Sequence, residues 1–137
     1  MEKINIIESE KNITQNEIIE FETNFNLALP ENYKKLILKY NGGIDSNGES
    51  ILSEIYSIKY GNLLVERVIH TLQIIENNIS RDYFPFATTG TGNEITLNLK
   101  AGSNYGKIYL FRYDELKPIK IADSLEELLG VKNIDEL

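Results

Sequence analysis

The sequence predicts one compact α+β domain that spans residues 1–137. Three observations favour this fold class. Apolar residues recur at helical spacing in the first half of the chain, they alternate with polar residues in the second half, and a capped helix follows at the end. No internal repeat or low-complexity linker interrupts this order. A chain of 137 residues is long enough to remove about two thirds of its unfolded surface from water.

The first predicted helix covers residues 13–25. Thr14 can accept a hydrogen bond from a free amide of the first turn, and Glu17, three residues later, completes a capping box. One face of this helix is apolar, because positions i, i+3 and i+7 are occupied by Ile18, Phe21 and Phe25.

A second helix is predicted to open at Pro30, whose missing amide would have no partner there, and Glu31 suits the positive end of the helix dipole. Asn41, Gly42 and Gly43 indicate the end of this helix, because glycine adopts positive φ without a steric clash. The buried stripe would consist of Tyr33, Leu36, Ile37 and Tyr40, with Lys34, Lys35 and Lys39 facing water.

The middle of the chain carries weaker signals. A polar loop is predicted over residues 44–50, and the apolar run of residues 51–58 favours a strand around residues 54–58 or a helical turn followed by a strand. Residues 62–77 predict a third helix that stops at two asparagines. Its apolar positions at near-helical spacing are Leu64, Val68, Leu72 and Ile75.

A hairpin follows in the second half. Residues 83–88 predict a strand in which Pro85 cannot donate a ladder hydrogen bond, so it indicates a strand start, an edge or a bulge. Gly90 and Gly92 make the turn into residues 94–99, which alternate and present an apolar face.

The remaining predicted strands cover residues 107–113 and 119–122. In the first of them apolar and aromatic residues occupy both faces, which indicates a central or doubly covered strand. Ser124 can then cap a last helix, with Glu127 at the capping-box position. This helix would dock through Leu125, Leu128, Leu129 and Val131.

The composition excludes several kinds of function. The chain has no cysteine, so it has no disulfide framework, thiolate metal site or cysteine nucleophile. With 14 Lys and Arg against 21 Asp and Glu, its formal charge of −7 repels nucleic acids and anionic membranes and attracts a basic partner. The first ten residues lack the pattern of a signal peptide, and no apolar run approaches the ~20 residues that span a bilayer. We therefore expect a cytoplasmic protein.

Motifs that suggest catalysis are weak. The Thr-Gly-Thr-Gly-Asn turn of residues 89–93 is followed by a strand and lacks the lysine and helix of a phosphate loop, so a hairpin is the better interpretation. His70, the single histidine, lies on a predicted structural helix. We expect no catalytic residue and no cofactor.

Oxygen-bearing side chains offer two further alternatives. The oxygens of Asp45, Asn47 and Glu49 suit calcium, but the longer pattern of an EF-hand loop is absent, so a solvated turn and no metal are expected. A hydrolase could use paired carboxylates, although no spacing fixes two of them across a cleft. The carboxylates available for such a pair are Glu54, Asp82, Glu94 and Asp114.

An ordered set of motifs from residue 18 to residue 129 resembles the SMI1/KNR4 family, also called SUKH. In that family a helix opens at Leu-Pro, carries a following Tyr and ends at Asn-Gly-Gly, and here these are Leu29, Pro30, Tyr33 and residues 41–43. A Pro-Phe-Ala strand, a Gly-Asn turn, an alternating strand, a Gly-led strand and an Ala-x-Ser helix entry follow. The matching residues are Pro85, Phe86, Ala87, Gly92, Asn93, Leu97, Gly106, Ala122 and Ser124.

The resemblance implies a strongly bent antiparallel sheet flanked by helices. Bacterial members are similar to immunity proteins that neutralise secreted toxins, often nucleases or nucleic-acid deaminases, while fungal members regulate cell-wall synthesis through protein contacts. Neither role is enzymatic. Where the family often has two aspartates and a phenylalanine, this chain has Thr89, Asn98 and Leu125, so a site built on those carboxylates is not carried over.

The resulting hypothesis is an immunity protein that binds a cognate protein toxin with a basic surface and binds neither nucleic acid nor membrane. Two alternatives stay open, a general protein-interaction or regulatory module without a toxin partner and an enzyme that acts on small molecules. Tyr56, Tyr60, Tyr105 and Tyr113 are candidate aromatic anchors. The candidate partner-binding carboxylates are Asp45, Glu49, Glu54, Asp82, Glu94, Asp114 and Glu115.

Overall fold

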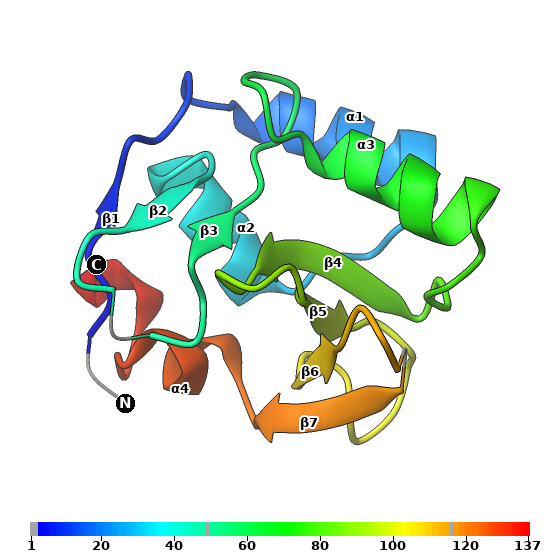
Figure 1. The fold of residues 1–137 in the computed structure, drawn as a ribbon. Coiled ribbons are helices and arrows are strands. Elements are labelled where there is room, and N and C mark those ends of the chain that lie inside the picture. The colour runs from blue at the N-terminus through cyan, green and yellow to red at the C-terminus, as the bar shows by residue number, and fades with distance from the viewer. Residues whose placement is uncertain (1–2, 49, 116) are drawn as a thin grey trace.

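The computed structural model describes residues 3–48, 50–115 and 117–137 (Figure 1). In this part of the chain, seven strands form one antiparallel sheet whose strand order is the order of the chain, and helices join and follow the strands, which confirms the α+β class. The elements are β1 (Ile6–Ile7), α1 (Gln15–Phe25), α2 (Glu31–Lys39), β2 (Gly43–Asp45), β3 (Glu54–Ile55), α3 (Val65–Ile69), the π-helix η1 (His70–Ile75), β4 (Tyr83–Thr88), β5 (Glu94–Asn98), β6 (Ile108–Phe111), β7 (Pro118–Ala122), α4 (Leu125–Leu129) and the 3₁₀-helix η2 (Ile134–Glu136).

The first two helices begin where the sequence predicts. Thr14 precedes α1, and its Oγ1 accepts a hydrogen bond from the Glu17 amide at 3.2 Å. The Glu17 carboxylate accepts one from the Thr14 amide at 3.0 Å, so the capping box is confirmed. α2 begins directly after Pro30.

α2 ends before the glycine pair. Lys39 is its last residue, and Tyr40 is already extended, with φ −137°. Gly42 makes the following turn with φ +79°, and Gly43 is the first residue of β2. The prediction of a polar loop over residues 44–50 is therefore wrong at its start, because a strand of three residues is too short to show an alternating pattern.

The third helix buries a different face from the predicted one. Val65, Ile69 and Gln73 are its buried residues, one position along from the expected stripe. The shift is already present at Val65 and Ile69 in the α-helical part, so it arises before the wider turns of η1 begin at His70. The predicted positions are half-buried or exposed: Leu64, Val68, Leu72 and Ile75, the last of these 66 % exposed.

β4 lies in the middle of the sheet and carries a bulge. Its pairing with β5 shifts in register between Pro85 and Ala87. Of the three predicted explanations for Pro85, namely a strand start, an edge or a bulge, the bulge is therefore confirmed. Phe84 and Phe86 meet the same ring, that of Tyr33 on α2, edge-on at centroid distances of 5.1 and 5.9 Å. This contact joins α2 to the centre of the sheet.

α4 is capped by Ser124, whose Oγ accepts a hydrogen bond from the Glu127 amide at 3.0 Å. The predicted cap by Ser124 is therefore confirmed. The Glu127 carboxylate differs from a regular capping box, because it accepts a hydrogen bond from the Asp123 amide at 3.0 Å, one residue before the cap. The Leu129 carbonyl accepts a hydrogen bond from the Ile4 amide at 3.0 Å, which joins the N-terminal segment to α4. As predicted, the helix buries Leu125, Leu128 and Leu129.

The two faces of the sheet differ in what they carry. In Figure 1, β4 and β7 run across the view while β5 and β6 are seen nearly end-on, so the sheet is strongly bent, as the family resemblance implies. One face packs with the helices into the hydrophobic core and includes Ile55, Phe84, Ile95, Leu97, Ile108 and Leu110. The side chains that alternate with these make up what we call the outer face: Glu54, Tyr83, Thr88, Glu94, Thr96, Tyr109 and Phe111.

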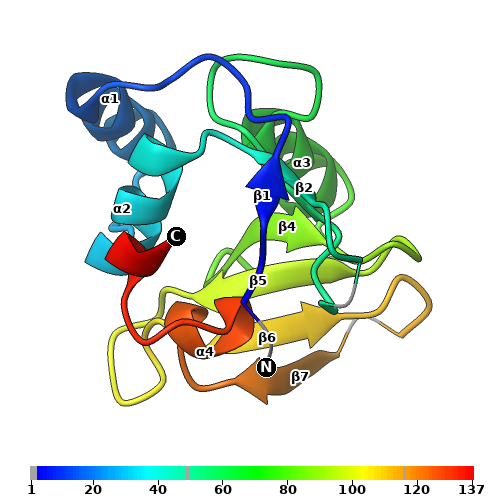
Figure 2. The same cartoon turned by 90° about the vertical axis from the view of Figure 1, so that its left-hand side faces the viewer.

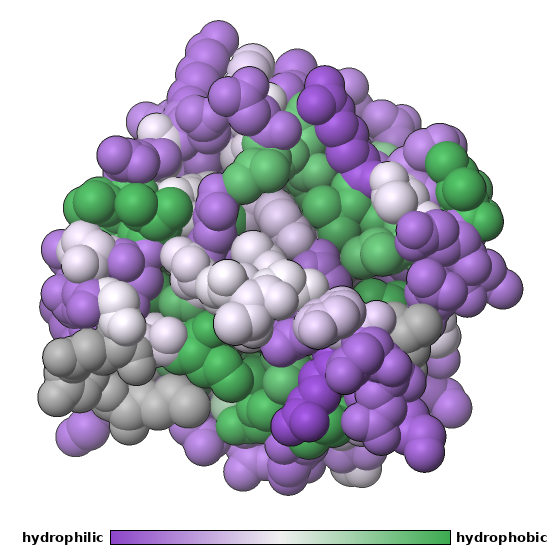
Figure 3. Space-filling model, in the orientation of Figure 1, coloured by the Kyte–Doolittle hydropathy of each residue, from purple (hydrophilic) through white to green (hydrophobic). Residues whose placement is uncertain are grey.

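Three loops gather at one end of the sheet. Neighbouring strands are antiparallel and follow chain order, so the loops after β2, β4 and β6 emerge at the same end. Figure 2 shows these loops together on its right-hand side, the side that faces the viewer in Figures 1 and 3. We call this part of the molecule the loop end.

Candidate protein-binding surface

Most of the carboxylates predicted to bind a partner lie at the loop end. Asp45 is the last residue of β2, while Glu54 and Glu94 are the first residues of β3 and β5. Asp114 and Glu115 are exposed in the loop after β6. Acidic residues from separate parts of the sequence are thus brought to one end of the sheet.

Two of the predicted residues are not part of this group. Glu49 lies outside the residues that the structure describes. Asp82 is exposed and precedes β4, which places it at the opposite end of the sheet. There its carbonyl accepts a hydrogen bond from the Leu99 amide at 2.7 Å.

Asp45 differs from the other carboxylates at the loop end because its side chain binds the backbone. It is half-buried, and its Oδ1 accepts hydrogen bonds from the amides of Asn5 at 3.2 Å and Asn47 at 3.1 Å. These contacts fix the turn after β2 against the N-terminal segment. Asp45 therefore has a structural role in addition to its charge.

The three loops enclose a shallow hollow of about 540 Å³. The amide of Tyr113 donates to Asn93 Oδ1 at 3.2 Å and so connects two of the loops. Within the turn, Thr89 Oγ1 accepts from the Asn93 amide at 3.1 Å, and the predicted hairpin is confirmed by the pairing of β4 with β5. In Figure 3, residues of intermediate hydropathy cover the middle of this end. The lining includes Ile51, Thr89, Asn93, Arg112, Tyr113 and Asp114.

The outer face brings Glu54, Tyr56 and Glu94 together. Glu54 and Glu94 lie in one cross-strand row, because both pair with Thr88. The Tyr56 hydroxyl donates to Glu94 and lies 2.6 and 2.8 Å from its two carboxylate oxygens. Burial raises the pKa of Glu94 to about 7, although the hydrogen bond from Tyr56 opposes the shift. Burial also raises the pKa of Glu54, and the carboxylate of Glu8 adds to this effect.

Three aromatic rings cover the adjoining part of the outer face. Tyr83 meets Tyr109 and Phe111 edge-on, with ring centroids 5.4 and 5.0 Å apart. Thr96, which pairs with Tyr109, is fully buried and donates to the Tyr109 carbonyl at 2.9 Å. Phe111 is the cross-strand partner of Glu94, whereas the Glu94 carboxylate is bonded to Tyr56 on the other side of β5.

Sequence reasoning missed two carboxylates near Glu54. Glu8 and Glu10 line a groove of about 260 Å³ together with Glu54, Gly43 and Asn62. No motif marks these glutamates, and their place depends on the pairing of β1 with β2. The one available signal is that the segment before α1 contains several glutamates.

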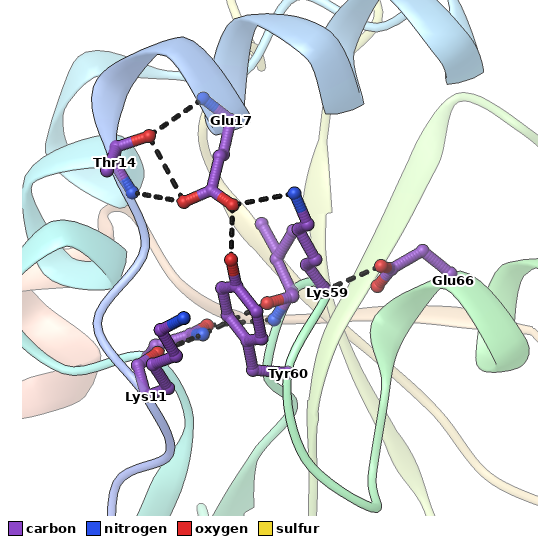
Figure 4. A network of polar contacts seen from close by, with 8 residues as sticks. Lys11, Thr14, Glu17, Lys59, Tyr60 and Glu66 are labelled. Carbon is purple, nitrogen blue, oxygen red and sulfur yellow. Dashed lines mark hydrogen bonds and ion pairs between the residues drawn. The ribbon is translucent and has the colours of Figure 1, made fainter.

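Tyr60, one of the candidate aromatic anchors, forms contacts with other side chains of the fold (Figure 4). Its hydroxyl donates to the Glu17 carboxylate at 2.5 Å, and the Lys59 ammonium group binds the same oxygen at 2.7 Å. The Lys11 ammonium group lies 4.6 Å from the centre of the Tyr60 ring. Bonding to Lys59, then to Tyr60 and Thr14, lowers the pKa of Glu17 to about 2.

The other three tyrosines have different surroundings. The Tyr105 hydroxyl donates to the Ala28 carbonyl at 2.6 Å and ties the loop after β5 to the segment between α1 and α2. Tyr56 is buried against Glu94. Tyr113 is 71 % exposed at the loop end, so its ring is accessible to a partner.

The remaining candidate chemistry can be placed as well. His70 is an exposed residue at the start of η1. Within residues 3–48, 50–115 and 117–137, no group of three or more histidine, aspartate or glutamate side chains is arranged to hold a metal ion. In the same ranges, every helix is too short or too polar to cross a membrane.

Most of the chain is similar to a known protein family. The model of a family described as SMI1-KNR4 cell-wall matches residues 15–129, which is most of the chain and includes the elements from α1 to α4 with the loop end. No curated protein matches the chain.

Proposed function

The chain belongs to the SMI1-KNR4 (SUKH) family, and on this premise we propose that it is an immunity protein that neutralises a cognate toxin by direct binding. The toxin in this proposal acts on nucleic acid in the cytoplasm and presents a basic surface to its substrate. The acidic domain occupies that surface and excludes the substrate. The chain itself makes and breaks no covalent bond.

The observation that carries this proposal is the gathering of carboxylates at the loop end. Glu54, Glu94, Asp114 and Glu115 come from three separate segments, and the strand order brings them to the same end of the sheet. Arg112 and Lys117 lie in the same region, and their positive charges offset part of this negative charge. The formal charge of −7 adds a long-range attraction to a basic protein.

The experiment that tests the proposal is co-expression with the toxin encoded in the neighbouring reading frame. We expect rescued growth and a stable complex that can be purified. Absence of both would refute the immunity role, whichever surface binds.

The contribution of charge is tested with two double variants of equal charge change. Asp114→Lys with Glu115→Lys alters the loop end, and Glu20→Lys with Asp82→Lys alters exposed acids elsewhere. At low salt we expect the first variant to slow association by about tenfold and the second by much less. Equal rates for both variants would reject the loop end as the steering surface.

A second candidate is a protein-interaction module without a toxin partner. The description of the matching family as SMI1-KNR4 cell-wall favours it. In that case the neighbouring reading frames would encode no secreted toxin, and the purified chain would bind a host protein through the same loop end.

A further inference from the structure

A second hollow, of about 230 Å³, lies at the end of the sheet opposite the loop end. Its lining comes from the last turn of α1 with the residues that follow, from the third helix, and from the loop before β4. We call it the arginine hollow and define it by Phe25, Leu27, Ile69, Gln73, Ile74 and Arg81. Pockets for small organic ligands begin at about 300 Å³, so this hollow suits a single amino-acid residue instead.

The apolar wall of the arginine hollow is left partly uncovered by the fold. Asn26 ends α1 in the left-handed conformation with φ +53°, and the Leu27 amide donates to the Glu22 carbonyl at 2.9 Å. This turn places Leu27 and Phe25 at the same hollow, where both side chains are half-buried. Ile74 of η1 also lines the hollow and is 46 % exposed. Apolar surface of this kind is available to an apolar side chain of a partner.

Gln73 brings an unused hydrogen-bond acceptor to the arginine hollow. The residue is only 7 % exposed, and its Nε2 donates to the carbonyls of Ser80 at 3.0 Å and Tyr83 at 2.5 Å. These two acceptors fix the orientation of the side-chain amide, so Oε1 points away from them. Among the described residues, no donor is bound to Oε1. A buried acceptor requires a donor, and an N–H group of a ligand in the hollow would supply it.

Arg81 adds a positive charge without a protein partner. It is exposed, and among the described residues it joins none of the ion pairs. A guanidinium group binds a carboxylate through two parallel hydrogen bonds. A ligand that matches all three features has an apolar side chain, an N–H and a carboxylate on one residue. The C-terminal residue of a polypeptide carries this set of groups.

We propose that the arginine hollow binds the C-terminal residue of a partner protein when that residue has a large apolar side chain such as leucine. The side chain packs against the apolar wall, the backbone N–H donates to Gln73 Oε1, and the terminal carboxylate binds Arg81. The loop end lies at the other end of the sheet, so each site can hold its own partner. The inference therefore goes beyond the proposed function, and neither depends on the other.

The test uses the tetrapeptide N-acetyl-Gly-Ser-Gly-Leu as the probe and NMR of the full chain as the readout. We expect saturable shifts at the rings and methyl groups of the apolar wall. The same peptide with a C-terminal amide has no carboxylate, and a peptide that ends in alanine has no large side chain. Each should bind at least about tenfold more weakly. Equal binding of either peptide would overturn the inference.

Gln73 is tested from the peptide side, because a substitution there would also release the carbonyls of Ser80 and Tyr83. An ester oxygen in place of the last peptide N–H removes the donor and should weaken binding by about fivefold. Unchanged binding of the ester would overturn the role of Gln73 Oε1. The peptide changes leave the protein unaltered, so they decide the question even where a variant is unstable.

Two pairs of matched variants test the protein side. Arg81→Gln should weaken binding by about tenfold, whereas Arg67→Gln, at an exposed arginine outside the hollow, should bind as the native chain does. Ile74→Asn removes part of the apolar wall and should weaken binding by about fivefold. Ile75→Asn, at the next residue and outside the hollow, should not. Equal binding by the native chain and Arg81→Gln would overturn the inference.

A free small acid is the alternative occupant of the arginine hollow. N-acetyl-leucine carries the same three groups, and we expect it to shift the same signals as the tetrapeptide. Binding of N-acetyl-leucine without binding of the tetrapeptide would overturn the docking of a chain terminus. Arg81→Gln should neutralise the toxin as the native chain does, so a failure of this site and a failure of the immunity role are observed separately.

Discussion

The side-chain amide of Asn41 forms hydrogen bonds in both directions with the backbone of Ile58. Its Nδ2 donates to the Ile58 carbonyl at 3.0 Å, and its Oδ1 accepts from the Ile58 amide at 2.8 Å. Nδ2 also donates to the Lys11 carbonyl at 2.9 Å. One fully buried side chain thus joins the segment before α1, the turn after α2 and the chain that follows β3.

Replacing this side chain should destabilise the fold strongly. Asn41→Ala leaves buried backbone groups of Ile58 without partners, and we expect a loss of about 3 kcal/mol in the free energy of unfolding. Urea denaturation measures the loss. Asn62→Ala is the control, because Asn62 is exposed, and it should change stability by less than about 0.5 kcal/mol. A small effect at Asn41 would show that water replaces the amide.

The raised pKa of Glu94 predicts a pH-dependent difference between the native chain and Glu94→Gln. The native state binds this proton more readily than the unfolded state, so the stabilising contribution is complete below about pH 4.5 and is lost as the pH rises through about 7. Gln does not titrate. Between pH 4.5 and 8, the free energy of unfolding of Glu94→Gln should therefore rise relative to the native value by about 1–3 kcal/mol. A constant difference across this range would contradict the prediction.

Glu17 predicts the opposite dependence. Its pKa is lowered to about 2, so its contribution is present above about pH 4.5 and is lost as the pH falls through about 2. Glu17→Gln should melt at a lower temperature than the native chain at pH 7, and the two melting temperatures should converge in acid. Glu20→Gln, on the same helix and exposed, should follow the native curve. Parallel curves for Glu17→Gln and the native chain would refute the linkage.

The Tyr33 hydroxyl is buried without a hydrogen-bond partner among the described residues. Removing a buried hydroxyl of this kind relieves its desolvation, so Tyr33→Phe should leave the free energy of unfolding unchanged or raise it by up to about 1 kcal/mol. Tyr33→Leu should lower it by about 2–3 kcal/mol, because the edge-on contacts with Phe84 and Phe86 are lost. A clear loss in Tyr33→Phe would mean that the hydroxyl is paired in solution.

Local signals with a direct chemical cause could be predicted from the sequence. Thr14 and Ser124 cap helices, and a bulge directly follows Pro85, and each of these features depends on a few neighbouring residues. The strand β2 (Gly43–Asp45) could not be predicted, since it exists through its pairing with β1 and β3. The π-helical continuation of α3 likewise reflects packing and has no simple local pattern.

The candidate site likewise combines features that local sequence signals predict with features that depend on the tertiary fold. The acids at strand starts and in loops could be picked out as exposed charges, but their grouping depends on strand direction. Glu94 begins a strand that leaves the loop end, whereas Asp82 directly precedes one that arrives there, so similar local positions fall at opposite ends. The contact of Tyr56 with Glu94 also reaches from the end of β3 across β4 to β5, which no local pattern records.

A meandering sheet lets its hairpin turns lengthen without any change in strand order. Each hairpin turn at the loop end connects strands that are already adjacent, so added residues there extend the rim without separating a paired strand. Doubling such a connection costs only about 0.6 kcal/mol in chain entropy. The architecture can therefore diversify its recognition by insertions at three neighbouring tips while the scaffold beneath them stays unchanged.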